Sequence, residues 1–187
     1  MRRGSIIFNP AMDFELLLIR LAEAQAHGRE IIGLEQLAQA LAERANQPLV
    51  LEDHPWLQKV APRLAAQGVT DFNFLSEMPP DQAGMAQINT LVTVAAGAIP
   101  ETGSLIITAQ SPLAFRLSGC PRQHIIIVPQ ERAGLTLAQA LELTAQEPSG
   151  LVSWLTGPSR TADIEKTLVL GAQGAESLEV LIYCPES

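Results

Sequence analysis

The chain has 187 residues, of which 47% are hydrophobic, and this combination fits one domain with a full core. Acidic residues (20) outnumber basic ones (12), the net charge is −8, and the basic residues form no stripe, so we expect neither a nucleic-acid nor a membrane partner. The longest apolar run, residues 91–99, is too short to span a bilayer, and the first residues contain no secretory signal. We therefore expect a cytoplasmic protein.

The first predicted element is a helix over residues 13–26. Its leucines recur at helical spacing, Asp13 can cap its start, and Gly28 can end it. Leu16 and Ile19 lie off the main apolar stripe, so this helix is apolar over most of its girth. We expect it to be able to pack on a partner as well as on its own domain.

The rest of the first 80 residues is predicted to be helical and then mixed. Residues 34–42 have the pattern of a second amphipathic helix, and residues 48–51 are short and β-like. Pro55 can begin a third helix, which Pro62 should break or kink. Residues 68–84 are expected to be a loop that forms a soft boundary inside a single domain, 1–187, rather than a linker between two domains.

Residues 85–187 have an α/β pattern. The run 125–128 is apolar on both faces, which places it in the middle of a mostly parallel sheet covered by helices. Thr136 and Gln139 predict a capped helix over 136–146, with Leu137 and Leu141 as its apolar edge. The predicted fold class is therefore α/β, with a mostly parallel central sheet flanked by helices. The strand candidates are 91–95, 105–108, 125–128, 151–155 and 178–183.

The first candidate site is the turn 100–104, directly before a predicted strand. Gly103 would let the backbone approach a ligand closely, Thr102 and Ser104 offer hydroxyls, and Glu101 could act as a base or nucleophile. The alternative is an ordinary turn with a solvated glutamate, and the residue types alone favour that alternative.

The second candidate site is segment 157–165, which follows the run 151–155, predicted to be a buried strand. Free backbone N–H groups after Pro158, together with a guanidinium, would suit a carboxylate or phosphate. Ligands of open α/β sheets bind beyond the carboxyl ends of the strands, where we expect this segment to lie. The alternative is a helix cap with a surface pair of Arg160 and Asp163. The ligand-binding candidates here are Gly157, Ser159, Arg160, Thr161, Asp163 and Glu165.

Metal and redox chemistry find little support in the residues. Cys120 and Cys184 are 64 positions apart and form no paired motif, so the chain alone cannot hold an iron–sulfur cluster, and no metal site is expected. His124, at the head of the predicted central strand, could be a base or ligand but is more simply a hydrogen-bonded core residue. Phosphate-binding, dinucleotide-binding and hydrolase-serine motifs are absent from the sequence.

Three segments, in this order, resemble the lactate-utilisation (LUD) domain family, and most closely its protein C branch. They are residues 101–105, residues 124–128, and residues 156–165 followed by the glycine-containing turn 170–174 and the strand 178–182. The resemblance covers roughly residues 85–185. It departs from the family where the turn usually reads Gly-x-His-Gly-Pro, because Gln173 stands in place of the histidine and cannot shuttle a proton near neutral pH.

The resemblance implies the fold of sugar-phosphate isomerases, CoA transferases and formyltetrahydrofolate cyclo-ligase. It also implies a role beside iron–sulfur subunits that oxidise L-lactate to pyruvate, with the cluster in a partner and no cofactor in this chain. We therefore expect an accessory subunit with an anion-binding pocket. The alternatives are a stand-alone binder or transferase for a carboxylate, phosphate or CoA-type ligand, and a scaffold with a decayed pocket. The residues assign no catalytic role and do not decide whether the chain is an enzyme.

Overall fold

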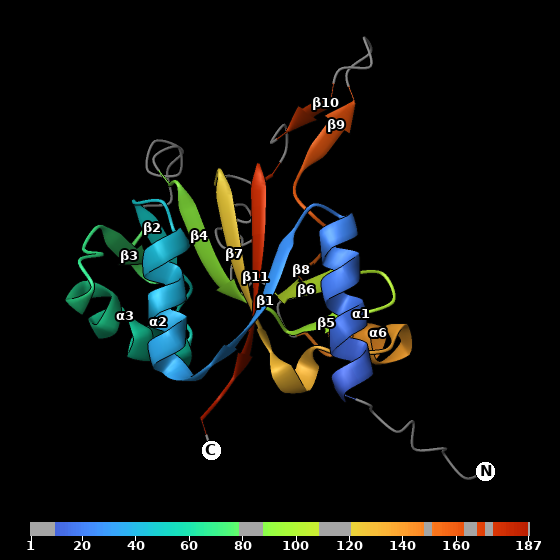
Figure 1. Cartoon of the computed structure of the whole chain (residues 1–187). Helices are drawn as coiled ribbons and strands as arrows, with labels where there is room; N and C mark the ends of the chain where they lie inside the picture. The colour runs from blue at the N-terminus through green and yellow to red at the C-terminus, as the bar shows by residue number, and fades with distance from the viewer. Residues whose placement is uncertain are drawn as a thin grey trace.

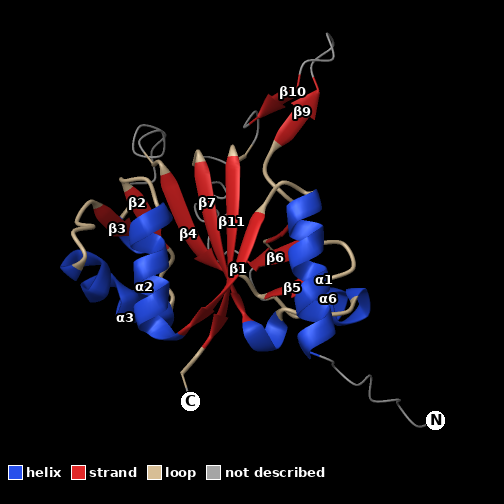
Figure 2. Cartoon of the chain, viewed as in Figure 1, coloured by secondary structure: helices blue, strands red, loops and turns tan. Residues whose placement is uncertain are grey.

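A six-stranded sheet, parallel throughout, forms the centre of the molecule (Figure 1). The computed structural model describes residues 10–78, 88–108, 121–147, 151–162, 168–170 and 174–186. The strand order is β1-β11-β7-β4-β2-β3. Helices flank the sheet (Figure 2), which confirms the predicted fold class. The strands are β1 (His27–Ile32), β2 (Leu49–Leu51), β3 (Phe72–Phe74), β4 (Thr90–Val94), β7 (Gln123–Pro129) and β11 (Ser177–Cys184).

Strand β7 lies inside this sheet, between β11 and β4, as its apolar pattern predicted. Residues 125–128 are all 0% exposed, because both faces of the strand are covered. The even-numbered and odd-numbered residues of the strand enter different core clusters, one on each side of the sheet. A continuous apolar run was therefore a reliable indicator of a central parallel strand.

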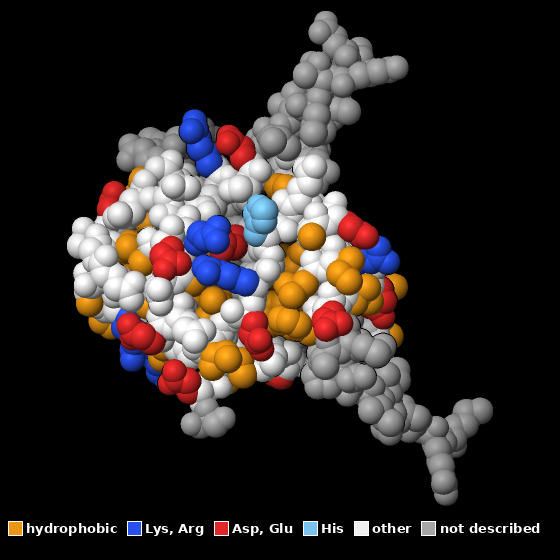
Figure 3. All heavy atoms as spheres, viewed as in Figure 1, with side chains coloured by type: hydrophobic (Ala, Val, Ile, Leu, Met, Phe, Trp, Pro, Cys, Tyr) orange, Lys and Arg blue, Asp and Glu red, His pale blue; other side chains and the backbone are white. Residues whose placement is uncertain are grey.

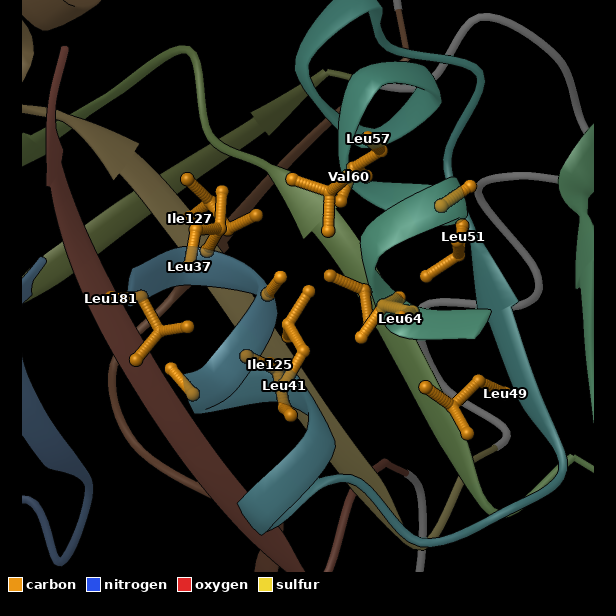
Figure 4. Close-up of a cluster of buried hydrophobic side chains, with 14 of the residues drawn as sticks. Leu37, Leu41, Leu49, Leu51, Leu57, Val60, Leu64, Ile125, Ile127 and Leu181 are labelled. Atoms are coloured by element: carbon orange, nitrogen blue, oxygen red, sulfur yellow. The ribbon is translucent and has the colours of Figure 1, made fainter. Parts of the chain in front are cut away.

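Helices α2 (Gly33–Arg44) and α3 (Pro55–Ala66) cover one face of the sheet. Figure 4 shows their leucines and valine pointing toward side chains of the strands. This cluster is continuous from β11 to β2, so the first 80 residues supply both strands and covering helices to the same core. Its labelled members are Leu37, Leu41, Leu49, Leu51, Leu57, Val60, Leu64, Ile125, Ile127 and Leu181.

The opposite face is covered by helix α1 (Pro10–Glu23) and by a small antiparallel sheet of order β5-β6-β8. Helix α6 (Leu137–Ala145) packs on the outer side of the small sheet, where its Ala140 joins the same cluster as residues of β5 and β6. The small sheet consists of β5 (Gly97–Ile99), β6 (Ser104–Thr108) and β8 (Val152–Leu155). The remaining elements are the short 3-10 helices η1 (Leu75–Glu77) and η2 (Gln130–Arg132), and the antiparallel pair β9 (Arg160–Ala162) and β10 (Leu168–Leu170).

The first helix ends earlier than predicted. It runs from Pro10 to Glu23, so Asp13 lies inside it rather than capping it. Gln25, with φ of 62°, turns the chain, and Gly28 belongs to strand β1 instead of ending the helix. Strand β1 was missed because it is a half-exposed edge strand with little apolar alternation. Ile19 is 55% exposed and Leu16 is partly buried, so the part of α1 off the main stripe is only partly covered.

Helix α3 continues through Pro62, which was predicted to break or kink it. The apolar residues Leu57, Val60 and Leu64 are all fully buried against the sheet. Their burial offsets the backbone hydrogen bond that proline cannot make. Burial of these side chains therefore outweighs the tendency of proline to break a helix.

Two other predictions need correction. Phe72–Phe74, expected to be loop, pairs with β2 as strand β3. The run expected to be a buried strand forms β8, an edge strand of the small sheet, and its Trp154 is 37% exposed. On α6 the predicted cap of Thr136 and Gln139 is confirmed.

The predicted apolar edge of α6 faces outward. Leu137 is 55% and Leu141 54% exposed, whereas Ala140 is fully buried. The helix therefore packs on the small sheet through a smaller residue than the leucine spacing suggested.

On the face that Figure 3 shows, basic side chains lie beside acidic ones, and apolar side chains gather where Figure 1 draws α1. Among the described residues, no helix has the length and apolar character needed to cross a bilayer.

Candidate functional site

The two candidate segments meet at one end of the small sheet. Strand β6 begins at Ser104 and pairs with β8, so Leu105 lies opposite Leu155. The Ser104 hydroxyl oxygen lies 2.8 Å from the hydroxyl oxygen of Thr156, and it accepts a hydrogen bond from the Thr102 hydroxyl, also at 2.8 Å. The structure thus brings together three hydroxyl groups, of which Ser104 and Thr156 are 52 positions apart in the chain. We call Thr102, Ser104 and Thr156 the hydroxyl cluster.

The glycines beside this cluster pack against helix α1. Gly103 has φ of 67°, and a Cβ there would lie 2.9 Å from the Cβ of Arg20. Gly157 has φ of 88°, and a Cβ there would lie 2.5 Å from the backbone oxygen of Ala24. Both positions therefore require glycine for backbone conformation and for close contact with the helix. The close approach predicted at Gly103 is real, but the neighbour is α1 rather than a ligand.

The described part of segment 157–165, residues 157–162, follows the carboxyl end of β8, but its Ser159 lies at the amino ends of the central strands. The Ser159 N–H donates to the Ala175 carbonyl at 2.9 Å, and the Glu176 N–H donates to the Arg122 carbonyl at 2.8 Å. Ala175 and Glu176 precede β11, and Arg122 precedes β7. The predicted location at the carboxyl ends of the parallel sheet is wrong, because β8 belongs to the separate antiparallel sheet.

The backbone of this segment is engaged rather than free. The N–H of Ser159 is used in the bond to Ala175, and Arg160 and Thr161 belong to strand β9, which pairs with β10. Figure 1 shows this pair extending away from the body of the molecule. The prediction of free N–H groups from Ser159 onward is therefore wrong at Ser159. Asp163 and Glu165, like Gln173, lie outside the described residues.

The remaining members of the first candidate turn differ in exposure. Glu101 and Thr102 are exposed, whereas Gly103 is buried and Ser104 is 7% exposed. The arrangement can offer a small ligand the exposed Thr102 and the hydroxyls behind it.

Helix α1 adds the guanidinium of Arg20, which forms an exposed pair with Glu23 at 2.7 Å. Arg20 could not be found from the sequence, because its helix docks on the turn from a distant part of the chain.

His124 is a core residue. It is 1% exposed, and its Nε2 lies 2.9 Å from the hydroxyl oxygen of Thr93 on the neighbouring strand β4. Burial lowers the pKa of His124 to about 4, so the imidazole is neutral at physiological pH. The hydrogen-bonded alternative is therefore the one that the structure supports.

The described part of the chain contains one of the two cysteines. Cys184 is a partly buried free thiol at the end of β11, and Cys120 lies outside the described residues. Across the described ranges, no group of three or more histidine, cysteine or acidic residues is placed to hold a metal ion.

The sequence reading also missed two polar residues. Thr156 follows β8 and completes the hydroxyl cluster, and Glu52 follows β2 with its carboxylate bonded to the Val94 N–H at 2.6 Å. Each stands directly after a strand; that position marks a candidate, and the strand order decides whether it lies where ligands bind.

Residues 76–183, more than half of the chain, match the family model of the LUD domain. The chain belongs to the LUD domain family. The matched range includes turn 100–104, the hydroxyl cluster, His124 and segment 157–165.

Relatives of the LUD chain come from the protein C branch. The chain is 31% identical over 109 residues to "Lactate utilization protein C" of Deinococcus radiodurans. This match covers 57% of the chain and 51% of that protein. It is 30% identical over 95 residues to the protein of the same name from Bacillus subtilis, covering 47% of this chain and 39% of that protein. The matches thus span about half the length of these relatives or less.

A solved structure shares the fold of the LUD chain. The crystal structure of a DUF162 family protein from Deinococcus radiodurans superposes with a TM-score of 0.71 over 95% of this chain and 99% of that one, at 20% identity. At this identity the likeness concerns the fold alone.

Proposed function

We propose that this chain is a non-redox accessory subunit in lactate utilisation. It acts in the cytoplasm beside iron–sulfur subunits that oxidise L-lactate to pyruvate, and the cluster resides in those partners. The observation that carries the proposal is the similarity, at about 30% identity, to proteins named lactate utilization protein C. The sequence supports a role without a cluster in this chain, since two cysteines cannot supply the four thiolates that a cluster generally needs.

The proposal includes a binding site for a small anion at the hydroxyl cluster. Hydroxyls donate hydrogen bonds to carboxylate and phosphate oxygens, and Arg20 of α1 packs against Gly103 of the same turn through its Cβ and backbone. Arg160, four positions beyond Thr156, supplies a guanidinium in the sequence. The proposed site is on the side of the amino ends of β7 and β11, where the Ser159 N–H donates to the Ala175 carbonyl.

Affinity purification tests the partnership. The full chain, tagged and expressed in its source organism, should retain an iron–sulfur protein after crosslinking, recognised by its visible absorption and iron content. The same tag without the chain is the control. Recovery of the chain free of any iron–sulfur protein after crosslinking would count against the accessory role.

A thermal-shift series tests the anion site. L-lactate, pyruvate and inorganic phosphate are compared, because a ligand at about a hundred times its dissociation constant adds about 2.7 kcal/mol of stability. Thr156→Val and Arg160→Ala should remove the shift.

Thr108→Val is the matched control, since Thr108 lies at the other end of β6 and pairs with Val152. Shifts that survive Thr156→Val and Arg160→Ala would place the binding elsewhere. A shift with CoA esters instead of lactate or pyruvate would favour a stand-alone binder or transferase.

A further inference from the structure

The connections after the neighbouring strands β2 and β4 leave the central sheet toward opposite faces. Strand β2 leads into α3, which packs in the same cluster as Leu51 and Val92. Strand β4 leads to Ala95 and Ala98, which pack in the cluster on the other face with α1. In open α/β sheets, ligands bind beyond the carboxyl ends of the strands at such a point of divergence. The hydroxyl cluster is not at this end of the sheet.

Glu52 stands at this point and is held there by the backbone. It is the first residue after β2, and its N–H donates to the Val92 carbonyl at 2.9 Å. Its Oε2 accepts a hydrogen bond from the Val94 N–H at 2.6 Å. The side chain is partly exposed, and among the described residues its Oε1 has no hydrogen-bond partner. One carboxyl oxygen is thus fixed while the other is available.

The polar groups next to Glu52 already have structural partners. Asp53 accepts hydrogen bonds from the N–H and hydroxyl of Ser76, at 2.8 and 2.5 Å, and so holds the turn after β3. His54 accepts from the Trp56 N–H through Nδ1 at 3.3 Å and caps α3. These contacts give Asp53 and His54 structural roles, but neither contact involves the Glu52 side chain.

A carboxyl group at this position has an unfavourable environment. Burial is the main cause that raises the pKa of Glu52 to about 7; the Val94 hydrogen bond opposes this effect, and the charge of neighbouring Asp53 adds to it. Within the described part of the chain, Glu52 forms no ion pair with a lysine or arginine. The hydrogen bond from Val94 favours the ionised form but does not outweigh burial, and groups in ligand sites often have such surroundings.

We propose that Glu52 is the anchoring residue of a second ligand site, at the carboxyl ends of β2 and β4, for the neutral carbonyl or hydroxyl part of a small organic molecule. A phosphate or carboxylate facing Glu52 would be repelled, because Asp53 is acidic and Glu52 has no paired cation among the described residues. A neutral group is favoured over a cation, because burial disfavours the ionised carboxylate that a cation would need. The protonated carboxyl donates a hydrogen bond to a carbonyl oxygen, and the ionised carboxylate accepts one from a hydroxyl. This site does not depend on the proposed anion site.

Solution NMR on the full chain tests the proposal, with the Val94 backbone amide as reporter. The probes are acetone, hydroxyacetone and glycerol, which carry a carbonyl, both groups, or hydroxyls alone. Each probe that binds should shift the Val94 amide saturably. For acetone the affinity should fall about tenfold per pH unit above pH 7, because a carbonyl oxygen cannot donate to an ionised carboxylate.

Glu52→Gln should abolish this pH dependence and change the affinity for hydroxyacetone at least tenfold. The matched control is Glu77→Gln, which alters a nearby exposed carboxylate that likewise accepts one backbone hydrogen bond, from Phe74 at 2.8 Å. A carboxyl 13C titration of the intact chain provides a second measurement, in which a bound probe must move the Glu52 midpoint. An unshifted Val94 amide with all three probes, or equal binding by Glu52→Gln, would overturn the proposal. Loss of anion binding at the hydroxyl cluster would not affect it.

Discussion

Gly157 and Gly68 have nearly the same backbone conformation in different surroundings. Their φ angles are 88° and 85°, but a Cβ at Gly157 would lie 2.5 Å from the Ala24 oxygen, whereas nothing lies within 4 Å of one at Gly68. Gly68→Ala should therefore lower the free energy of unfolding by about 1–2 kcal/mol, through left-handed backbone strain alone. Gly157→Ala should lose at least about 1 kcal/mol more, because the turn must move off α1. Urea unfolding of both variants measures the difference, and equal losses would contradict the packing role of Gly157.

The hydrogen bond between His124 and Thr93 allows a second test at the scale of residues. Thr93→Val keeps the shape but leaves the buried imidazole nitrogen without a partner, so it should destabilise the fold by about 1–3 kcal/mol. Replacing both residues, with Thr93→Val and His124→Leu, should cost less than the sum of the single changes. Urea unfolding of the double-mutant cycle checks this. Additive losses would show that the hydrogen bond contributes nothing.

At the scale of elements, Pro62 gives the clearest test of whether core packing outweighs the low helix propensity of proline. It is exposed inside α3, so Pro62→Ala removes no core contact and restores an N–H in the helix interior. We expect a gain of about 1–3 kcal/mol, reduced by the greater freedom of the unfolded chain. Pro55→Ala is the matched control, since proline at the helix start loses no hydrogen bond and should change little. Thermal unfolding compares the two, and a gain no larger at Pro62 would contradict the argument.

The sequence predicted those elements whose pattern reflects their burial. Strand β7 is covered on both faces and α2 on one, and both were found from their apolar residues. Edge strands were the failures: β1 was missed, and β8 was taken for a buried strand. An edge strand is defined by its neighbours along the sheet, and these depend on pairing with residues far away in the chain.

The same limit applies to the site at the scale of the whole molecule. The sequence singled out Ser104 and the segment beginning at Gly157, and the structure places Ser104 beside Thr156. The sequence could not show that β8 lies outside the parallel sheet. The prediction therefore placed the segment at the wrong end of the central strands. Glu52 was missed because its importance comes from the divergence of two connections, which only the strand order reveals.

The shifted pKa values of Glu52 and His124 should give the whole molecule opposing pH dependences. The pKa of Glu52 is raised from 4.5 to about 7, so the stability that its protonated form contributes is complete below pH 4.5 and is lost as the pH rises to about 7. The pKa of His124 is lowered from 6.5 to about 4, so the stability of its neutral form is complete above pH 6.5 and is lost as the pH falls to about 4. Between pH 4.5 and 6.5 the two effects partly cancel.

Single substitutions should separate these two effects. Relative to the unmodified chain, Glu52→Gln should gain stability as the pH rises from 4.5 to 7, because glutamine cannot ionise. His124→Gln should instead gain relative stability as the pH falls from 6.5 to 4. Urea unfolding at half-unit pH intervals gives both slopes, and each group can contribute at most about 1.4 kcal/mol per pH unit. Parallel curves for Glu52→Gln and the unmodified chain would mean that Glu52 ionises as an ordinary surface carboxylate, and the second ligand site would then lose its electrostatic support.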